Sequence, residues 1–259
     1  MAKYVRYRRG DASGYGELKG TTVHPLDGDF GHWRPSHEGP VPLSEVKLLA
    51  PAQPTKIIAI GPNYKIYFRD GSSPPPQPML WTKPASCLND PEGTIDLPPG
   101  HTINHESELA MVIGKRAKDI NPSKAQDYIF GYTCMNDVTA GDFANPGAFA
   151  ASHYFVDGKI FDTFAPLGPL IETDIDADNL HVECRVNGKV RQSHSTSDFL
   201  FTPAFLVAMI SRVLTLFPGD VISMGSPPGV APLLDGDTVE IEIEKIGILR
   251  NYVRNRPST

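Results

Sequence analysis

The stretch from His105 to Lys115 constrains the fold of this chain more than any other part of the sequence. Its second half is an almost continuous apolar run. A run without alternation is typical of a strand that is buried on both faces, or of a piece of buried helix. This run is short, contains the β-branched pair Val112 and Ile113, and ends at Gly114. These features predict a strand that lies inside the core.

Two glutamates stand at the start of this strand. Because successive side chains of a strand point to opposite faces, Glu106 and Glu108 point the same way. The same face carries Ala110 and Val112, which have the character of core residues. Two carboxylates side by side at the edge of a core are costly unless something positive lies between them. A divalent cation with oxygen ligands is the simplest candidate, and a partly solvated strand end is the alternative.

The same spacing of glutamates occurs near the C-terminus, in Val239–Glu244. There the intervening positions are only valine and isoleucine, which is typical of a strand with one apolar and one solvated face. We predict no function for those glutamates. Spacing alone therefore does not identify a ligand pair, and the neighbouring residues decide the interpretation.

A third acid follows another predicted strand. Residues 132–138 are strand-like and contain Asp137 next to Asn136. Magnesium favours a few carboxylates together with retained water molecules, so Asp137 is the candidate for the third ligand. The alternative is that Asp137 closes an Asx-turn by bonding to its own backbone.

Composition sets the broad class of the protein. A chain of 259 residues suffices for one large domain, or for one domain with a small appendage. The net charge is −6 and there is no basic stripe of the kind that nucleic acid binding needs. The sequence has no apolar run long enough for a transmembrane helix and no signal peptide, and its three cysteines suit a reducing compartment. We expect a cytoplasmic protein that binds neither nucleic acid nor membranes.

Turn signals divide the chain into two parts. Residues 1–53 contain short strand-like segments between turns, and Pro51 and Pro54 mark a linker. We expect a small N-terminal β region over residues 1–53 and a larger domain over residues 54–259. The 25 prolines and 23 glycines cluster at turns, which predicts many short strands with structured loops. The expected fold class is mixed α/β and rich in strands.

Two helices and a hairpin follow from local signals. Asn121 and Thr202 are each followed by proline, which is typical of an N-cap residue with proline at the first helical position. The second helix is expected to run to about Leu216. Asn187 is followed by glycine and predicts a hairpin. Helical spacing predicts that the core face of the second helix contains Phe205, Met209, Val213 and Leu216.

Several ordered motifs resemble the fumarylacetoacetate hydrolase family, in its small acylpyruvate hydrolase, decarboxylase and isomerase branch. The resemblance covers about residues 54–255. The matching motifs are KII..G.NY at residues 56–64, HExELA at 105–110, GYT..NDV at 131–138, KxFDTFAPxGP at 159–169, NGxxxQ at 187–192 and PGDVI..GTP at 218–227. Six motifs in the right order are a specific signature of membership.

The resemblance implies a mixed β-roll core, a homodimer and a Mg²⁺ or Mn²⁺ ion held by Glu106, Glu108 and Asp137. In such a site the metal is a Lewis acid toward the 2-oxo or enol oxygen of the substrate. Lys159 would add positive charge beside that oxygen; the alternative is a surface lysine. The resemblance also implies four positions that contact the substrate: Tyr64, Gln192, Gly225 and Ser226.

Two departures from the family pattern concern catalysis. The hydrolases of the family carry a histidine and an acid that activate water, often on a mobile lid, and Tyr67 and Asp70 stand at these positions. An unperturbed tyrosine titrates near pH ~10 and is a poor base at neutral pH, so Asp70 would act alone or Tyr67 would act as an acid. Gly141 replaces an arginine that grips the substrate carboxylate. The sequence leaves open whether residues 62–78 form a lid.

These residues predict an enzyme that acts on a 2-oxo or β-dicarbonyl carboxylate-type substrate through a metal-stabilised enolate. The expected reaction is C–C bond hydrolysis or decarboxylation. The alternatives are an enol–keto isomerase of the same family, which needs no activated water, and a metal-binding relative that has lost catalysis. The missing arginine favours a larger or less charged substrate than a small pyruvate-like acid.

Overall fold

The computed structural model describes residues 2–144 and 157–256. Strands far outnumber helices in the described chain, so the predicted strand-rich fold class is confirmed. The largest sheet has 13 strands, and ten of them form one continuous path. In spatial order these are β4 (His32–Pro35), β3 (Thr22–Asp29), β2 (Ala12–Lys19), β1 (Lys3–Arg9), β15 (Ala165–Glu172), β13 (Ile129–Asn136), β12 (Ser107–Ile113), β18 (Val221–Ser223), β7 (Ile57–Gly61) and β8 (Met79–Lys83).

Three short strands join this sheet beside the main path, and two smaller sheets complete the fold. The short strands are β5 (Val41–Pro42), β6 (Lys47–Leu49) and β9 (Leu88–Asn89). The five-stranded sheet consists of β10 (Thr94–Leu97), β21 (Gly247–Asn255), β20 (Thr238–Ile243), β16 (His181–Val186) and β17 (Lys189–Ser195). The three-stranded sheet consists of β14 (Thr139–Ala140), β11 (Ile103–His105) and β19 (Ala231–Pro232).

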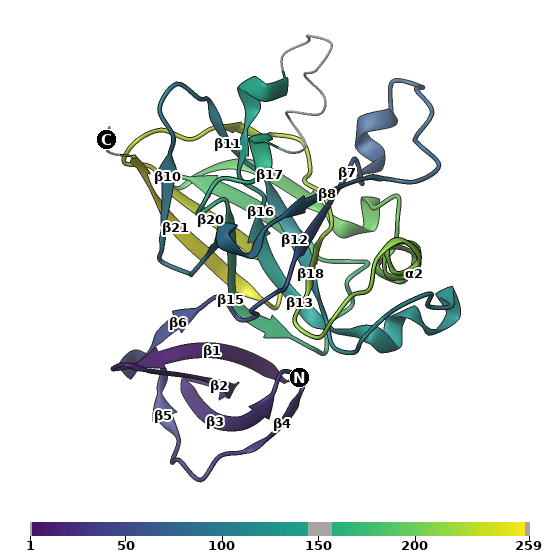
Figure 1. Cartoon of the computed structure of the whole chain (residues 1–259). Coiled ribbons are helices and arrows are strands. Elements are labelled where there is room, and N and C mark those ends of the chain that lie inside the picture. The colour runs from purple at the N-terminus through teal and green to yellow at the C-terminus, as the bar shows by residue number, and fades with distance from the viewer. Residues whose placement is uncertain (1, 145–156, 257–259) are drawn as a thin grey trace.

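Strand β12 lies in the centre of the molecule (Figure 1). All seven of its residues are buried, and it pairs with β13 on one side and β18 on the other. Leu109 and Met111 pack in one hydrophobic cluster, whereas Ala110 and Val112 pack in a second cluster on the opposite face. Because both faces are covered by apolar side chains, the run needs no alternation, as predicted.

The predicted strand from residue 105 onward is broken at Glu106. Strand β11 ends at His105 in the three-stranded sheet, and β12 begins at Ser107 in the large sheet. Glu106 therefore lies where the chain passes from one sheet to another. This position turns the glutamate toward the junction of the two sheets, a feature that the strand pattern did not predict.

The glutamates of β20 behave as predicted from their neighbours. Val239, Ile241 and Ile243 are buried, while the alternate positions are partly exposed. Glu240 and Glu242 accept hydrogen bonds from Arg185, at 3.2 Å and 2.8 Å. They form a cross-strand charge network on the partly exposed face of β20.

The helix of residues 203–213 starts where the sequence predicts. Thr202 caps α2 (Pro203–Val213) by accepting a hydrogen bond from the backbone N–H of Phe205 at 3.3 Å. The helix ends at Val213 rather than near Leu216. The predicted core face is wrong at Phe205, which is 40% exposed, and at Val213, which is 71% exposed. Met209 packs partly buried against the core, and Leu216 is fully buried beyond the end of the helix. The buried face is Pro203, Leu206, Val207 and Ile210. Both stripes of the helix are apolar, so spacing alone did not distinguish them.

Two other local predictions agree with the structure. Asn121 caps a helix over Pro122–Tyr128 by accepting a hydrogen bond from the N–H of Ser123 at 3.0 Å, although this element is a 3₁₀-helix. The hairpin between β16 and β17 turns at Asn187 and Gly188, both with positive φ. Positive φ at both central residues is the requirement of a type I′ turn.

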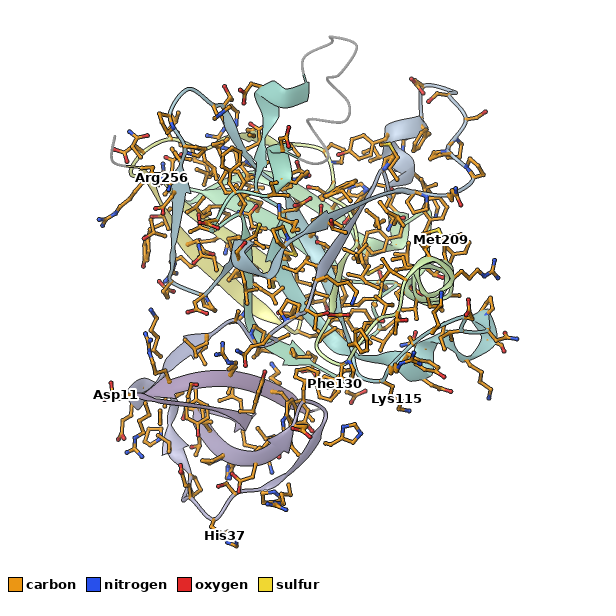
Figure 2. The ribbon with its side chains drawn as sticks, in the orientation of Figure 1. Asp11, His37, Lys115, Phe130, Met209 and Arg256 are labelled. Carbon is orange, nitrogen blue, oxygen red and sulfur yellow. The ribbon has the colours of Figure 1, made fainter. Side chains whose placement is uncertain are left out.

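The N-terminal strands lie below the rest of the molecule in the orientation of Figure 1. Strand β1 continues the large sheet by pairing with β15, where Lys3 lies opposite Glu172. A cluster of aromatic rings with centroids 5.0–5.8 Å apart joins the two regions: Tyr4, Tyr15, Phe30, Trp33 and Phe130. Phe130 belongs to β13 and lies at the border in Figure 2. The division between residues 53 and 54 stays a prediction.

None of the helices in the described part of the chain has the length and apolar character that spanning a membrane requires.

Candidate functional site

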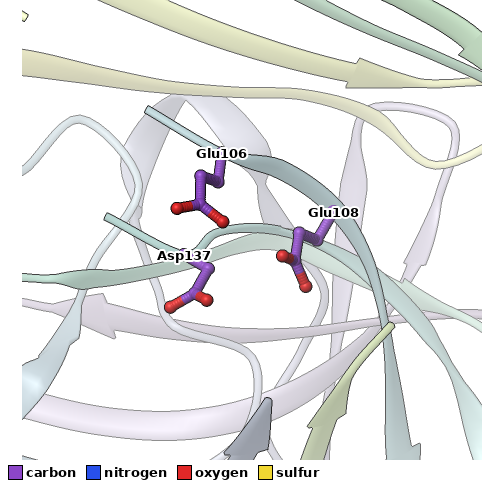
Figure 3. Close-up of side chains that lie close together, drawn as sticks. All are labelled: Glu106, Glu108 and Asp137. Carbon is purple, nitrogen blue, oxygen red and sulfur yellow. The ribbon is translucent and has the colours of Figure 1, made fainter. Parts of the chain in front are cut away.

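Three buried carboxylates meet at the junction of β11, β12 and β13. One oxygen from each of Glu106, Glu108 and Asp137 lies within 4.8 Å of the other two (Figure 3). The pairing of β12 with β13 produces this arrangement, because Ser107 lies opposite Asn136 and the backbone N–H of Asp137 donates to the carbonyl of Glu106 at 2.9 Å. The two predicted ligand motifs are therefore adjacent through strand register.

Hydrogen bonds fix the two glutamates. One carboxylate oxygen of Glu108, Oε2, accepts from the hydroxyl of Ser223 at 2.6 Å and from the backbone N–H of Gly225 at 2.8 Å. The other oxygen of Glu108 is buried and has no hydrogen-bond partner. Glu106 accepts from the hydroxyl of Thr139 at 2.7 Å. The geometry leaves one buried oxygen of Glu108 able to bind a ligand.

Two buried lysines contact the carboxylates. The ammonium of Lys159 lies 2.6 Å from Oδ2 of Asp137 and 3.1 Å from Oε1 of Glu106. The ammonium of Lys83 lies 2.7 Å from Oδ1 of Asp137 and donates to the carbonyl of Val138 at 3.0 Å. Lys159 is thus buried in the site rather than on the surface. Sequence reasoning missed Lys83, which is buried at the end of β8 although three of the five residues of that strand are exposed.

The charges of this group do not cancel. Burial raises the pKa of Glu108, and the charges of Asp137 and Glu106 raise it further. Burial also opposes ionisation of Asp137, but the ammonium groups of Lys159 and Lys83 prevail and lower its pKa. Three carboxylates face two ammonium groups, and the donors are all oxygen atoms. The residues therefore fit a hard divalent cation such as Mg²⁺ or Mn²⁺.

We expect Glu108→Gln to stabilise the metal-free protein by about 1–2 kcal/mol at neutral pH. A folded-state pKa above the ordinary value means that stability is present at low pH and is lost as pH rises toward the raised pKa of Glu108. Glutamine removes this loss, while its carbonyl oxygen still accepts from Ser223 and Gly225. Denaturant unfolding in chelator, from mildly acidic to mildly alkaline pH, measures the effect.

The same variant should no longer be stabilised by Mn²⁺, because a carboxylate ligand is lost. Glu242→Gln on β20 is the matched control, since Glu242 is paired with Arg185 outside the site. The control should keep the Mn²⁺ response of the unmodified protein. A metal-free Glu108→Gln protein that is less stable at every pH would contradict this account.

A cavity of about 240 Å³ opens beside Glu106 and Glu108. The residues that line it with these two carboxylates are Ile60, Gly61, Pro62, Tyr67, Trp81, Ser226 and Val230. A larger cavity of about 400 Å³ is lined by residues 7–38 of the N-terminal strands and contains none of the three carboxylates. The smaller cavity is therefore the candidate substrate pocket.

The structure separates the two residues that stand at the positions of the family's histidine and acid. The hydroxyl of Tyr67 lies at the cavity and donates to the carbonyl of Ser226 at 3.0 Å. Asp70 is exposed and accepts from the backbone N–H of Ser72 at 2.9 Å and from its hydroxyl at 2.6 Å. These hydrogen bonds lower the pKa of Asp70, which makes it a weaker base. Asp70 does not line the cavity in this structure.

The predicted substrate-contacting residues fall into two groups. Ser226 lines the cavity. Tyr64 is fully buried against Phe199, with ring centroids 4.9 Å apart, and its hydroxyl has no hydrogen-bond partner. Burial raises its pKa above the usual tyrosine range. Tyr64 is therefore placed behind the pocket, near Glu108, rather than in its wall.

Gln192 and Gly225 hold other parts of the site. The amide of Gln192 accepts from the N–H of Ser107 at 3.1 Å and donates to the hydroxyl of Ser226 at 2.7 Å. These two hydrogen bonds of Gln192 connect the start of β12 to the loop that contains Ser226. Gly225 has φ +89, and a Cβ there would lie 2.9 Å from Cβ of Asn63. Glycine is needed for the turn whose N–H binds Glu108.

The side chain of Asn104 lies beside Gly141, the residue that stands in place of the family's arginine. A Cβ on Gly141 would lie 2.3 Å from Nδ2 of Asn104. The backbone N–H of Gly141 donates to the carbonyl of Thr102 at 2.7 Å, which fixes it against this segment. A longer side chain at residue 141 would require the amide of Asn104 to move, and the glycine itself supplies no guanidinium for a substrate carboxylate.

Two family profiles together match most of the chain. The profile of the fumarylacetoacetate (FAA) hydrolase C-terminal family matches residues 56–254, and that of the Rv2993c-like N-terminal family matches residues 2–51. The mitochondrial oxaloacetate tautomerase FAHD2A of Bos taurus is 39% identical over 226 residues, which cover 82% of this chain and 71% of that protein.

Two solved structures share the fold over nearly the whole chain. The 5-carboxymethyl-2-hydroxymuconate delta-isomerase of Mycobacterium smegmatis has a TM-score of 0.89 and 37% identity, covering 98% of this chain and 100% of that one. Maleylpyruvate hydrolase from Sphingobium sp. SYK-6, in complex with manganese (II) ion and pyruvate, has a TM-score of 0.78 and 28% identity, with the same coverage. The relatives therefore include isomerases, hydrolases and tautomerases.

Proposed function

This chain belongs to the fumarylacetoacetate hydrolase family, and on that basis we propose that it is a divalent-metal-dependent enzyme that interconverts the keto and enol forms of a 2-oxo acid. The carboxylates of Glu106, Glu108 and Asp137 support a metal site beside a cavity. The observation that carries the choice of tautomerisation is the position of Asp70. Its carboxylate faces Ser72 rather than the cavity.

The reaction moves one proton from carbon 3, the carbon beside the 2-oxo group, to the 2-oxo oxygen. No water is consumed, so no base is needed to activate one. Among the described residues that line the cavity, the titratable side chains are Glu106, Glu108 and Tyr67. Hydrolysis of a C–C bond would need a base that deprotonates water. In the hydrolases of the family a histidine is this base, and Tyr67 stands at its position in this chain.

The residues of the chain divide the work as follows. A Mg²⁺ or Mn²⁺ ion bound by the three carboxylates would act as a Lewis acid toward the 2-oxo group. Lys159, which contacts Glu106 and Asp137, supplies positive charge where negative charge develops on the substrate oxygen. As the enol forms, the hydroxyl of Tyr67 at the cavity would donate its proton to the 2-oxo oxygen. Water at the exposed side of Tyr67 would accept the proton from carbon 3 and restore the proton of the hydroxyl.

Asp70→Asn should leave the tautomerisation rate within about twofold of that of the unmodified protein, because Asp70 is not part of the proposed proton path. The rate is measured by NMR as hydrogen–deuterium exchange at carbon 3 of pyruvate in the Mn²⁺-loaded protein. Tyr67→Phe is the comparison variant and should slow exchange, because it removes the hydroxyl at the cavity. A loss of activity in Asp70→Asn of about a hundredfold would instead indicate a catalytic base.

Products formed from an acylpyruvate distinguish tautomerisation from the C–C cleavage reactions. The metal-loaded protein is incubated with acetylpyruvate in deuterated buffer, and mass spectrometry follows the mixture. Deuterium uptake without cleavage is the expected result. Acetate with pyruvate would establish a hydrolase, and carbon dioxide from oxaloacetate, above the metal-only control, would establish a decarboxylase.

A further inference from the structure

We propose that the pocket recognises a 2-oxo acid with a single carboxylate and an apolar group beyond carbon 3, and that Trp81 and Val230 receive this apolar group. This inference rests on the proposed function, because it concerns the substrate of the same site. Three independent features of the described residues carry it: the wall of the cavity, the charge of the buried group and the packing that fixes Trp81.

Most of the residues that line the cavity beside the two carboxylates are apolar. Ile60 and Pro62 come from the end of β7 and the residues after it, Trp81 comes from β8, and Val230 precedes β19. Trp81 is 8% exposed and Val230 is 39% exposed, so the wall runs from the interior to the mouth of the cavity. Among the described lining residues there is no arginine or lysine that could bind a second carboxylate. Such a wall favours an alkyl or aryl group.

The formal charges of the buried carboxylates and lysines also favour a substrate with a single carboxylate. Glu106, Glu108 and Asp137 carry three formal negative charges, and Lys83 and Lys159 carry two positive ones. With a divalent cation the group has one net positive charge, which one substrate carboxylate neutralises. A second carboxylate would bring an uncompensated negative charge into a buried apolar space, which is costly.

Packing fixes the indole of Trp81 in the wall before any substrate arrives. The ammonium of Lys159 lies 4.9 Å from the centroid of its ring, within the range of a cation–π contact. A Cβ on Gly61 would lie 3.0 Å from Cη2 of Trp81, so the absence of a side chain at residue 61 allows the ring to pack closely against β7. A rigid aromatic wall can bind an apolar group with little loss of conformational entropy.

The test compares two ligands that differ only at the distal end. Oxaloacetate carries a carboxylate there, and its isopropyl analogue carries an uncharged group of the same number of heavy atoms. Calorimetry measures the Kd of each for the full chain loaded with Mn²⁺, and NMR measures exchange at carbon 3. We expect the isopropyl analogue to bind at least about tenfold more tightly than oxaloacetate.

Val230→Arg supplies the missing guanidinium at the mouth of the cavity. It should shift the ratio of the two Kd values by about tenfold toward oxaloacetate. Val213→Arg is the matched control, since Val213 is 71% exposed on α2 and does not line the cavity; it should leave the ratio unchanged. Trp81→Leu should weaken binding of the isopropyl analogue but not of oxaloacetate.

The outcomes separate the inference from the proposed function. Equal or tighter binding of oxaloacetate by the unmodified protein overturns the inference while exchange at carbon 3 still supports a tautomerase. An equal shift in Val230→Arg and Val213→Arg also overturns it. If neither ligand shows metal-dependent exchange, the proposed function fails, and the two Kd values still decide which distal group the pocket prefers.

Discussion

Asp137→Asn should lower the metal-dependent exchange rate at carbon 3 by about a thousandfold, because the variant loses a charged metal ligand. It should also lower the free energy of unfolding by about 3–5 kcal/mol. Asp137 is fully buried and its two oxygens contact Lys83 and Lys159 at 2.7 Å and 2.6 Å. An amide cannot compensate two buried ammonium groups. Exchange kinetics and denaturant unfolding measure the two effects.

Asp220→Asn is the control for the stability of a buried ion pair. Asp220 is fully buried and its Oδ2 lies 2.5 Å from the ammonium of Lys56, outside the carboxylate group. This variant should lose stability but keep its exchange rate when it is folded. Asp137→Asn protein that is folded, binds Mn²⁺ with unchanged affinity and retains full exchange activity would refute the role assigned to Asp137.

Lys159→Met should lower the exchange rate by about a hundredfold to a thousandfold, because it removes the positive charge expected to stabilise the developing oxyanion. Methionine fills a similar volume and keeps an apolar contact with Trp81. Binding of Mn²⁺ should be retained or strengthened, since the ammonium no longer competes for Glu106 and Asp137. The comparison of calorimetric Mn²⁺ affinity with the exchange rate separates these two effects.

Lys56→Met is the matched control for the lysine variant. Its ammonium pairs with Asp220 and lies over the ring of Phe217, 4.8 Å from the centroid. The substitution should affect stability without affecting exchange. A Lys159→Met protein that has lost Mn²⁺ binding would show that Lys159 organises the ligands rather than stabilising the substrate charge.

The three carboxylates could be predicted from sequence because each belongs to a strong local pattern. Glu106 and Glu108 stand next to the unbroken apolar run of β12, and Asp137 directly follows β13. The groups that hold them could not be predicted in this way. Ser223 lies 115 residues from Glu108, and Lys83 contacts Asp137 only because β8 and β13 belong to one folded sheet.

The core face of α2 and the partners of Gln192 show what a sequence pattern leaves undetermined. The core face of α2 was misplaced because residues of both stripes are apolar, and only the packing of Leu206 and Ile210 distinguishes them. Gln192 was predicted to contact substrate, a role that the structure leaves as a prediction, while its amide bonds to Ser107 and Ser226. A motif identifies a residue but does not specify which partner its side chain contacts.

The most direct test of the central claim is hydrogen–deuterium exchange at carbon 3 of a 2-oxo acid, measured by NMR with the purified full chain in chelator and after addition of Mn²⁺ or Mg²⁺. We expect rapid exchange only with metal, above a metal-only control, and no cleavage of the substrate. Exchange that is independent of metal, or cleavage products that form as fast as deuterium enters, would contradict it.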